Sequence, residues 1–205
     1  MKKLSIVLAI VLCAAVFFCV PVSATGEVAR LYVKARGTEI TVTVKTTAAV
    51  GALQGAVKYN KDVFGYEGAS ANSAILANNA TASSFQNVSG ATKFALVGDP
   101  SSGTNGEWAT VTYSADLGTP AVFEFTGVKA FDTNGANLGA ASNKIIMPGD
   151  VNNDNLVTIK DYVRLKRHYS NSVATSGEAD NKDVNMDGAS NYSDISYLRS
   201  DLLEN

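Results

Sequence analysis

The sequence predicts an N-terminal all-β sandwich followed by a small all-α module, and three observations lead to this prediction. Between residues 28 and 146 the chain holds short runs of alternating apolar and polar residues separated by turn signals, without a long amphipathic helix. Residues 148–203 contain a twelve-residue acidic loop twice, and the two copies begin 33 residues apart. Each copy continues into a segment whose apolar residues have helical spacing.

The chain begins with a segment typical of an export signal. Lys2 and Lys3 precede an apolar run from Leu4 to Val20, and a small-x-small cleavage site ends at Ala24. The alternative is a membrane-spanning anchor, but a run of about 17 residues is at the low end for a span, and no basic cluster follows it. We therefore expect residues 1–24 to be a signal peptide and the remainder to be secreted and extracellular, without membrane contact after cleavage.

Cysteine and charge content narrow the classes of function. Both cysteines, Cys13 and Cys19, lie inside the expected signal peptide, so the mature chain would have no disulfide, and bound metal is one other route to stability. Without the signal, 15 basic residues face 19 acidic ones, and the acidic excess lies after residue 147, where ten acids face six bases. No basic stripe is present, so the sequence indicates no nucleic-acid partner.

Individual strands can be placed within residues 25–146. Ile40–Lys45 alternates as a half-buried strand should, and Leu53, Val57 and Tyr59 share one face of the next strand. Its opposite face carries Ala52, Gln54, Ala56 and Lys58. Further strands are expected at Leu31–Ala35, Lys93–Val97, Trp108–Tyr113 and Val122–Thr126, and a loop or short helix over one edge at Ala69–Ala82. We expect two packed antiparallel sheets.

Nothing in this first domain marks a catalytic site. The chain has one histidine, His168, which lies in the second module, so no serine–histidine or cysteine–histidine pair can be assembled. Trp108 shares its strand parity with Thr110 and Thr112, which leaves two interpretations, a core residue at a strand end or an exposed platform for a sugar or partner. We favour the core position and expect no enzyme activity.

The repeated loops have the spacing with which one short loop wraps Ca²⁺. Oxygen-bearing side chains stand at positions 1, 3, 5, 9 and 12, and a backbone carbonyl is expected at position 7. Loop 1 supplies Asp150, Asn152, Asp154, Thr158 and Asp161, with the carbonyl of Leu156. Loop 2 supplies Asp183, Asn185, Asp187, Asn191 and Asp194, with the carbonyl of Ala189. We expect two structural Ca²⁺ ions.

The sharp bend at position 6 supports this assignment. It requires a residue that tolerates positive φ, and Gly188 in loop 2 and Asn155 in loop 1 are the two residue types best suited to that conformation. The alternative is a pair of polar turns without metal, but two loops in register, each running into a helix, make calcium binding the better interpretation.

The C-terminal segment resembles a dockerin, the module that plugs cellulosome components into scaffolds. The resemblance covers nearly all of Pro148–Leu203 and rests on Gly-Asp-Val-Asn at 149–152, on the duplicated loop, and on Leu-Lys-Arg at 165–167 with its counterpart Leu-Arg-Ser at 198–200. Ser190 departs from the pattern, because such loops usually carry an aliphatic residue there. The resemblance implies that residues 147–205 form two half EF-hands packed about a pseudo-twofold axis.

The same resemblance implies where a cohesin of a larger scaffoldin would bind. The expected contact residues are Ile159, Lys160, Lys166 and Arg167 in repeat 1, and Tyr192, Ser193, Arg199 and Ser200 in repeat 2. An apolar-basic set faces an aromatic-hydroxyl set, so we expect one dominant docking orientation. The alternative is that both sets are merely solvated helix faces.

The N-terminal domain is similar, in the order of its landmarks, to a cohesin, the jelly-roll receptor for dockerins. These landmarks are Val-Lys-Tyr-Asn at 57–60, a glycine-bounded strand at 90–97, Gly-Glu-Trp-Ala-Thr-Val-Thr-Tyr at 106–113 and Asp-Thr-Asn-Gly at 132–135. Where cohesins often have Tyr-Asp-Pro, this chain has Tyr59-Asn60-Lys61. The resemblance implies that Ala52, Gln54, Ala56 and Lys58 belong to a face that binds dockerin-bearing proteins.

Together these resemblances imply a non-catalytic adaptor scaffoldin. Its dockerin would dock onto a scaffold, and its cohesin-like domain would present a receptor to dockerin-bearing enzymes of plant cell-wall polysaccharide breakdown. Two alternatives are a carbohydrate-binding module fused to a dockerin, with Trp108 and nearby tyrosines as the sugar platform, and a small enzyme. The absence of a long linker at 143–148 predicts that the two modules lie close together.

Overall fold

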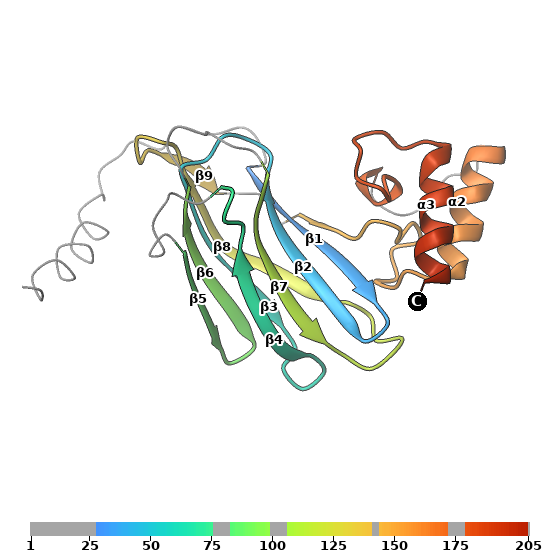
Figure 1. Cartoon of the computed structure of the whole chain (residues 1–205), viewed down its shortest axis with the longest axis horizontal. Helices are drawn as coiled ribbons and strands as arrows, with labels where there is room; N and C mark the ends of the chain where they lie inside the picture. Colours follow the sequence, from blue (N-terminus) through green and yellow to red (C-terminus); the bar gives the residue numbers. More distant parts are fainter. Residues whose placement is uncertain (1–27, 76–82, 99–105, 141–143, 172–178, 205) are drawn as a thin grey trace, which may run out of the picture.

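A computed structural model of the chain describes residues 28–75, 83–98, 106–140, 144–171 and 179–204. The expected signal peptide, residues 1–24, lies outside these ranges. Figure 1 shows a two-layered β unit and, beside it, a small helical unit that ends at the C-terminus. No helix within the described residues is both long and apolar enough to cross a membrane.

The first sheet has the strand order β10-β1-β2-β7-β4. Its strands are β1 (Ala29–Arg36), β2 (Glu39–Thr46), β4 (Gly65–Ala71), β7 (Glu107–Ser114) and β10 (Ile145–Ile146). All neighbours pair antiparallel except β10 and β1, which are parallel, with Leu31 opposite Ile145. The chain therefore leaves the β unit along β1, directly before the helical unit.

The second sheet has the order β5-β6-β3-β8-β9 and is antiparallel throughout. Its strands are β3 (Ala52–Tyr59), β5 (Ser83–Val88), β6 (Ala91–Val97), β8 (Phe123–Phe131) and β9 (Asn137–Ala140). The two sheets pack face to face, because each strand turns one row of apolar side chains toward the other sheet. The predicted all-β sandwich is confirmed.

The sandwich core follows the predicted alternation in most strands. On β3, Leu53 and Val57 are buried while Gln54 and Lys58 are exposed. At the centre, the hydroxyl of Tyr113 donates to Thr92 Oγ1 at 2.9 Å, so this buried phenol keeps a polar partner. Burial raises the pKa of the Tyr113 hydroxyl.

Trp108 lies in the core, with none of its surface exposed. Strict alternation would place it outward with Thr110, but the pairing of β2 with β7 shifts register between Val44 and Lys45. This β-bulge lets both Trp108 and Ala109 face inward. The indole N–H donates to Thr46 Oγ1 at 3.0 Å, so the ring is fixed inside the sandwich and the favoured core position is correct.

The structure also departs from the expected elements. The prediction of a loop or helix at Ala69–Ala82 is wrong in its first part, because Ala69–Ala71 belong to β4, while residues 76–82 lie outside the described ranges. Small residues obscured this edge strand, since an alternation of alanine, serine and glycine has little hydrophobic contrast. Strand β8 begins at Phe123, and Val122 is 54% exposed just before it.

The helical unit contains α2 (Ile159–Asn171), the short 3₁₀ helix η1 (Ala179–Lys182) and α3 (Tyr192–Leu203). Its core is small and consists of Val151, Leu165, Val184 and Leu198, one pair from each loop–helix repeat. The predicted small all-α module with two repeats is confirmed. The C-terminal module contacts the sandwich through its loops, η1 and α3, as predicted from the short junction.

Candidate calcium-binding loops and docking surfaces

Asp150 organises the first half of loop 1. Its two carboxylate oxygens accept the backbone N–H groups of Asp154 and Asn155, at 3.1 and 2.9 Å. Asp154 in turn accepts the N–H of Leu156 at 3.0 Å. These bonds fold the backbone around the carboxylates, so that the oxygens at positions 1, 3 and 5 lie on the inside of one tight turn.

Asp161, at position 12, closes the loop from the first turn of α2. One oxygen accepts the N–H groups of Val151 and Asn152, and the other accepts the N–H of Thr158 at 2.9 Å. The side chain is fully buried although it carries an acidic group. The carboxylate therefore joins the beginning of the loop to its end, as a bidentate metal ligand at position 12 must.

Loop 2 repeats the bonds from backbone N–H groups to carboxylates that fold loop 1. Asp183 accepts the N–H groups of Asp187 and Gly188 at 3.1 and 2.9 Å. Asp194 accepts those of Val184 and Asn191 at 2.8 and 2.7 Å. The two repeats share one local structure despite their different sequences, which a pair of unrelated polar turns would not do.

The bend residues take the conformation that the sequence predicted. Asn155 and Gly188, both at position 6, have φ values of 62° and 91°. Position 4 bends in the same sense in each loop, with Asn153 at 63° and Met186 at 58°. This second bend was not predicted in either loop. Asn153 is a residue type that could have indicated it, whereas Met186 is not.

The residues at position 9 serve as helix caps. The Asn191 side chain accepts the N–H of Ser193 at 2.8 Å and forms a capping box with Asp194 at the start of α3. Thr158 accepts the N–H of Lys160 at the start of α2. Position 9 often contacts the ion through water in loops of this type, which is compatible with capping.

The electrostatics of loop 1 favour a bound cation. Burial raises the pKa of the Asp150 and Asp161 carboxyls, and each is also raised by a neighbouring carboxylate, while backbone N–H groups oppose the rise. Two ionised acids buried together are unfavourable unless a positive charge offsets them. Among the described residues, the structure places no group of three or more His, Cys, Asp and Glu side chains so as to hold a metal ion. The calcium assignment therefore rests on the spacing of the oxygen donors and on the matching hydrogen bonds of the two loops.

This donor set fits Ca²⁺, which takes six to eight oxygen ligands. The residues that would hold it in loop 1 are Asp150, Asn152, Asp154, Leu156 through its carbonyl, Thr158 and Asp161. In loop 2 they are Asp183, Asn185, Asp187, Ala189 through its carbonyl, Asn191 and Asp194. The ion would neutralise the carboxylates and join each loop to the helix that follows it.

All eight predicted contact residues of the C-terminal module are exposed. They are Ile159, Lys160, Lys166 and Arg167 on repeat 1 and Tyr192, Ser193, Arg199 and Ser200 on repeat 2. The two sets differ in chemistry, and one member of the second set is anchored by contacts with α2. The Tyr192 hydroxyl donates to the Tyr169 carbonyl at 2.8 Å, and the two rings are 5.5 Å apart, so Tyr192 is held against α2.

The predicted receptor residues lie on the outer face of the second sheet. Gln54 and Lys58 are exposed and Ala52 and Ala56 partly so, on the opposite side of β3 from the core. Lys58 Nζ lies 3.8 Å from Glu124 Oε2 of β8, and both side chains are exposed to solvent. Strand β3 belongs to the second sheet, whereas the ion pairs with the C-terminal module are made by β1 of the first sheet. The β3 face and the predicted contact residues of the C-terminal module are therefore exposed on the same chain.

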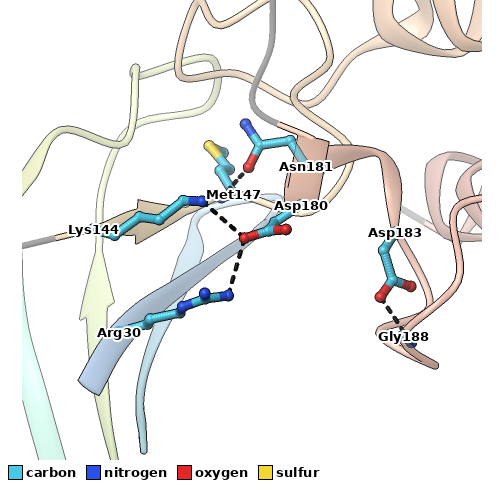
Figure 2. Close-up of polar contacts among 7 residues, drawn as sticks. All are labelled: Arg30, Lys144, Met147, Asp180, Asn181, Asp183 and Gly188. Carbon is cyan, nitrogen blue, oxygen red and sulfur yellow. Dashed lines mark hydrogen bonds and ion pairs between the residues drawn. The ribbon is translucent and has the colours of Figure 1, made fainter. Parts of the chain in front are cut away.

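Sequence reasoning missed a group of residues at the junction of the two units. Asp180 and Asn181 of η1 lie between the loops and contact the sandwich, and Figure 2 shows them beside Arg30 and Lys144. Asn181 is buried, and its Oδ1 accepts the Met147 N–H at 2.9 Å. No spacing signal marks these residues, because their partners are distant in the sequence.

Both parts of the chain are similar to known proteins. Residues 148–203 match the family model described as the dockerin type I domain. No curated protein matches the chain. Among solved structures it is similar to the sixth cohesin of scaffoldin B from Acetivibrio cellulolyticus, determined in complex with a dockerin, with 17% identity and a TM-score of 0.47, over 58% of this chain and 98% of that one.

Two further structures have a similar degree of likeness. CaCohA2 from Clostridium acetobutylicum is 17% identical, with a TM-score of 0.47, over 62% of this chain and 96% of that one. A non-cellulosomal cohesin from the archaeon Archaeoglobus fulgidus is 18% identical, with a TM-score of 0.44, over 58% of this chain and 87% of that one.

The structural neighbours of the chain are thus cohesin modules, at low identity. The family match covers both loops and both helices of the C-terminal unit, and those loops share one geometry. Residues 148–203 are therefore a dockerin type I domain, joined to an all-β sandwich.

Proposed function

We propose that this protein is a non-catalytic adaptor scaffoldin of an extracellular cellulosome. Its dockerin attaches the chain to a cohesin of a larger scaffold. Its sandwich presents a second receptor surface to dockerin-bearing enzymes that break down plant cell-wall polysaccharides. The observation that carries this proposal is the combination, in one chain, of a dockerin and a sandwich whose second sheet leaves its outer face uncovered by that dockerin.

Calcium is the proposed structural cofactor, with one ion in each loop. Dockerin type I domains bind calcium, and the two loops of this chain have matching oxygen donors and matching hydrogen bonds. The module's small core of four residues supports the same idea, since a unit of this size needs stabilisation beyond its hydrophobic contacts.

The receptor half of the proposal rests on the β3 face. Its residues are small or uncharged apart from Lys58, and the exposed Val97 on neighbouring β6 is 49% accessible. On the neighbouring strands, exposed Lys93 lies opposite Ala56 and exposed Lys129 opposite Gln54, so this face combines small apolar groups with cations.

The test is a pair of capture experiments on the full chain. Immobilised protein in calcium is offered cohesin modules in one experiment and dockerin-tagged fluorescent proteins in the other. We expect Gln54→Arg with Ala56→Arg to abolish dockerin capture and leave cohesin capture intact. Lys166→Glu with Arg167→Glu should have the opposite effect, so each variant is the other's control. Capture of neither class by the wild-type chain would reject the adaptor proposal.

The same assay addresses the docking orientation. Two variants are compared. One reverses the charges of Lys166 and Arg167 in repeat 1, and the other replaces Arg199 and Ser200 of repeat 2 with alanine. If one orientation dominates, the two variants should lower the affinity for cohesin unequally. Equal losses from the two repeats would contradict a single orientation.

The carbohydrate-binding alternative loses its main support. The indole of Trp108 is buried and hydrogen-bonded to Thr46, so it cannot serve as an exposed sugar platform. Retention of the full chain on insoluble cellulose in the absence of any scaffold protein would revive this alternative.

A further inference from the structure

The outward face of β1 carries an unusual row of cations. Arg30, Lys34 and Arg36 alternate with buried residues and therefore project from the same side of the strand, with Tyr32 between them. We call these four residues the basic face of β1. Like charges on one strand face repel each other and destabilise a sheet unless anions lie against them.

The C-terminal module supplies those anions. Asp180 of η1 accepts from Arg30 Nη1 at 3.0 Å and from Lys144 Nζ at 2.9 Å (Figure 2). Asp201 of α3 accepts from Arg36 Nη2 at 2.6 Å and pairs with Lys34 Nζ at 3.2 Å. Each acid therefore bridges two sandwich cations, and these are networks rather than single surface pairs.

Further contacts between the two units lie between Asp180 and Asp201 and make the interface continuous. Lys34 lies over the ring of Tyr197 at 5.5 Å, and Lys45 lies over the ring of Tyr32 at 4.8 Å. The Met186 sulfur of loop 2 is 3.9 Å from Lys45 Nζ. The cleft that remains between the units, about 300 Å³, is lined by residues of both.

This interface is built into the calcium loops. Asp180 precedes Asp183, the first ligand position of loop 2, by three residues. Buried Asn181 donates from Nδ2 to the carbonyl of Asp150, the first ligand position of loop 1, and its own carbonyl accepts the Gly149 N–H at 2.8 Å. Asp180, the acid that faces Arg30, thus belongs to a helix that is hydrogen-bonded to loop 1 and adjoins loop 2.

The sandwich also touches loop 1 directly. The Ala121 N–H, just before β8, donates to the carbonyl of Asn155 at 2.9 Å. Asn155 is the position-6 bend of loop 1. Both calcium loops are thus held by residues of the sandwich as well as by their own helices.

We propose that the basic face of β1 is a docking surface for the chain's own dockerin, and that this docking and calcium binding stabilise each other. Calcium orders the loops and so positions Asp180 and Met186 against the sandwich. By linkage, the contacts with the sandwich raise the calcium affinity by the same factor. The inference rests on the proposed calcium sites and is independent of any external partner.

The test is a calcium titration of the chelated full chain by isothermal calorimetry, with Arg30→Gln/Lys144→Gln against wild type. Coupling predicts an affinity about three- to tenfold lower in the variant. Simple Coulomb repulsion predicts the reverse, because removing two cations near an acidic loop favours a third cation. An unchanged or raised affinity would overturn the proposal.

Two comparisons make this result specific. Lys61→Gln/Lys129→Gln removes the same charge from sandwich positions away from the module and should leave the calcium affinity at its wild-type value. Asp180→Asn should lower the affinity as much as Arg30→Gln/Lys144→Gln, and combining all three changes should add little further loss. Additive losses would mean that these residues do not act through one another.

A second measurement follows the sandwich alone. Trp108 is the only tryptophan, so its emission reports unfolding of the sandwich. Calcium should raise the midpoint of that thermal transition in wild type and not in Arg30→Gln/Lys144→Gln. A wild-type chain that binds no calcium would refute the proposed calcium sites themselves. Binding without any shift of the Trp108 transition would refute only the coupling.

Discussion

At the scale of single residues, the loops are accurately predicted where the requirement is local. Asn155 and Gly188 take positive φ at position 6 because the backbone must turn around the first carboxylate there. The bend at Met186 was not predicted, because the loop imposes it on a residue that disfavours it. The spacing of oxygen donors was sufficient to predict the loops, but it did not indicate the positive φ at Met186.

The bend at Gly188 gives the first prediction. Gly188→Val places a β-branched residue at a φ of 91°, which costs about 1–3 kcal/mol. The calcium affinity of loop 2 should then fall by about one to two orders of magnitude in a calcium titration. Ala189→Val is the control, since position 7 contributes its carbonyl and its backbone is not in the positive-φ region. Equal affinities of the two variants would contradict the role of the bend.

Trp108 shows the limit of pattern reading at this scale. Alternation placed it outward, and one bulge beside Lys45 turned it inward. Bulges are not encoded by hydrophobic periodicity, so either interpretation of Trp108 was compatible with the sequence. Gly98 is consistent with the inward position of Trp108, because a Cβ at residue 98 would lie 2.6 Å from the indole Cη2.

Gly98→Ala is therefore predicted to destabilise the sandwich. The added methyl group overlaps the fixed indole ring, and overpacking of this kind costs about 1–3 kcal/mol. Urea unfolding followed by Trp108 emission measures the loss. Gly68→Ala, where nothing lies within 4 Å of the added Cβ, should unfold as wild type does. A Gly98→Ala chain as stable as Gly68→Ala would mean that the ring can move away.

At the scale of elements, hydrophobic contrast decided which strands could be predicted. Strands β1, β2, β3, β6 and β7 alternate large apolar with polar residues, and each was placed to within a few residues. The strands that were not predicted, β4, β5, β9 and β10, are short or rich in small polar residues. Their conformation comes from pairing with a neighbour, which local sequence does not record.

The helices of the dockerin pack around only four buried residues, so each of them is needed for stability. Leu198 of α3 is fully buried, and its replacement by alanine costs about 2–5 kcal/mol, comparable to the whole stability of a unit of this size. We expect Leu198→Ala to lower the helical circular dichroism of the calcium-loaded chain, whereas the wild-type chain should lose it only on chelation. Leu203→Ala changes the same residue type on the same helix, at 76% exposure, and should be neutral.

At the scale of the whole molecule, the joint between the modules was not predictable beyond their proximity. The bond from Arg36 to Asp201 spans 165 positions and that from Arg30 to Asp180 spans 150. The cations of β1 looked like an ordinary solvated strand face, because their anions belong to another unit. Only the folded chain brings these charges together.

Chelation of calcium should unfold the C-terminal module and leave the sandwich folded. With calcium removed, the uncompensated carboxylates of the loops repel, and the helical circular dichroism should fall. The Trp108 emission should remain that of a buried indole at room temperature, because the sandwich has its own core. Unchanged circular dichroism after chelation would show that the dockerin folds without metal.

The parallel pairing of β10 with β1 has a mechanical consequence. The Leu31 N–H donates to the Lys144 carbonyl at 3.1 Å, and β10 ends at Ile146, directly before the dockerin. If the proposed adaptor is pulled between a partner bound to the dockerin and another bound to the sandwich, the load reaches the sandwich at β10, which pairs with Leu31 and Tyr32 of β1. The ion pairs between β1 and the dockerin lie on the same strand and would share that load. The junction thus has a second set of contacts that must break before the two units separate.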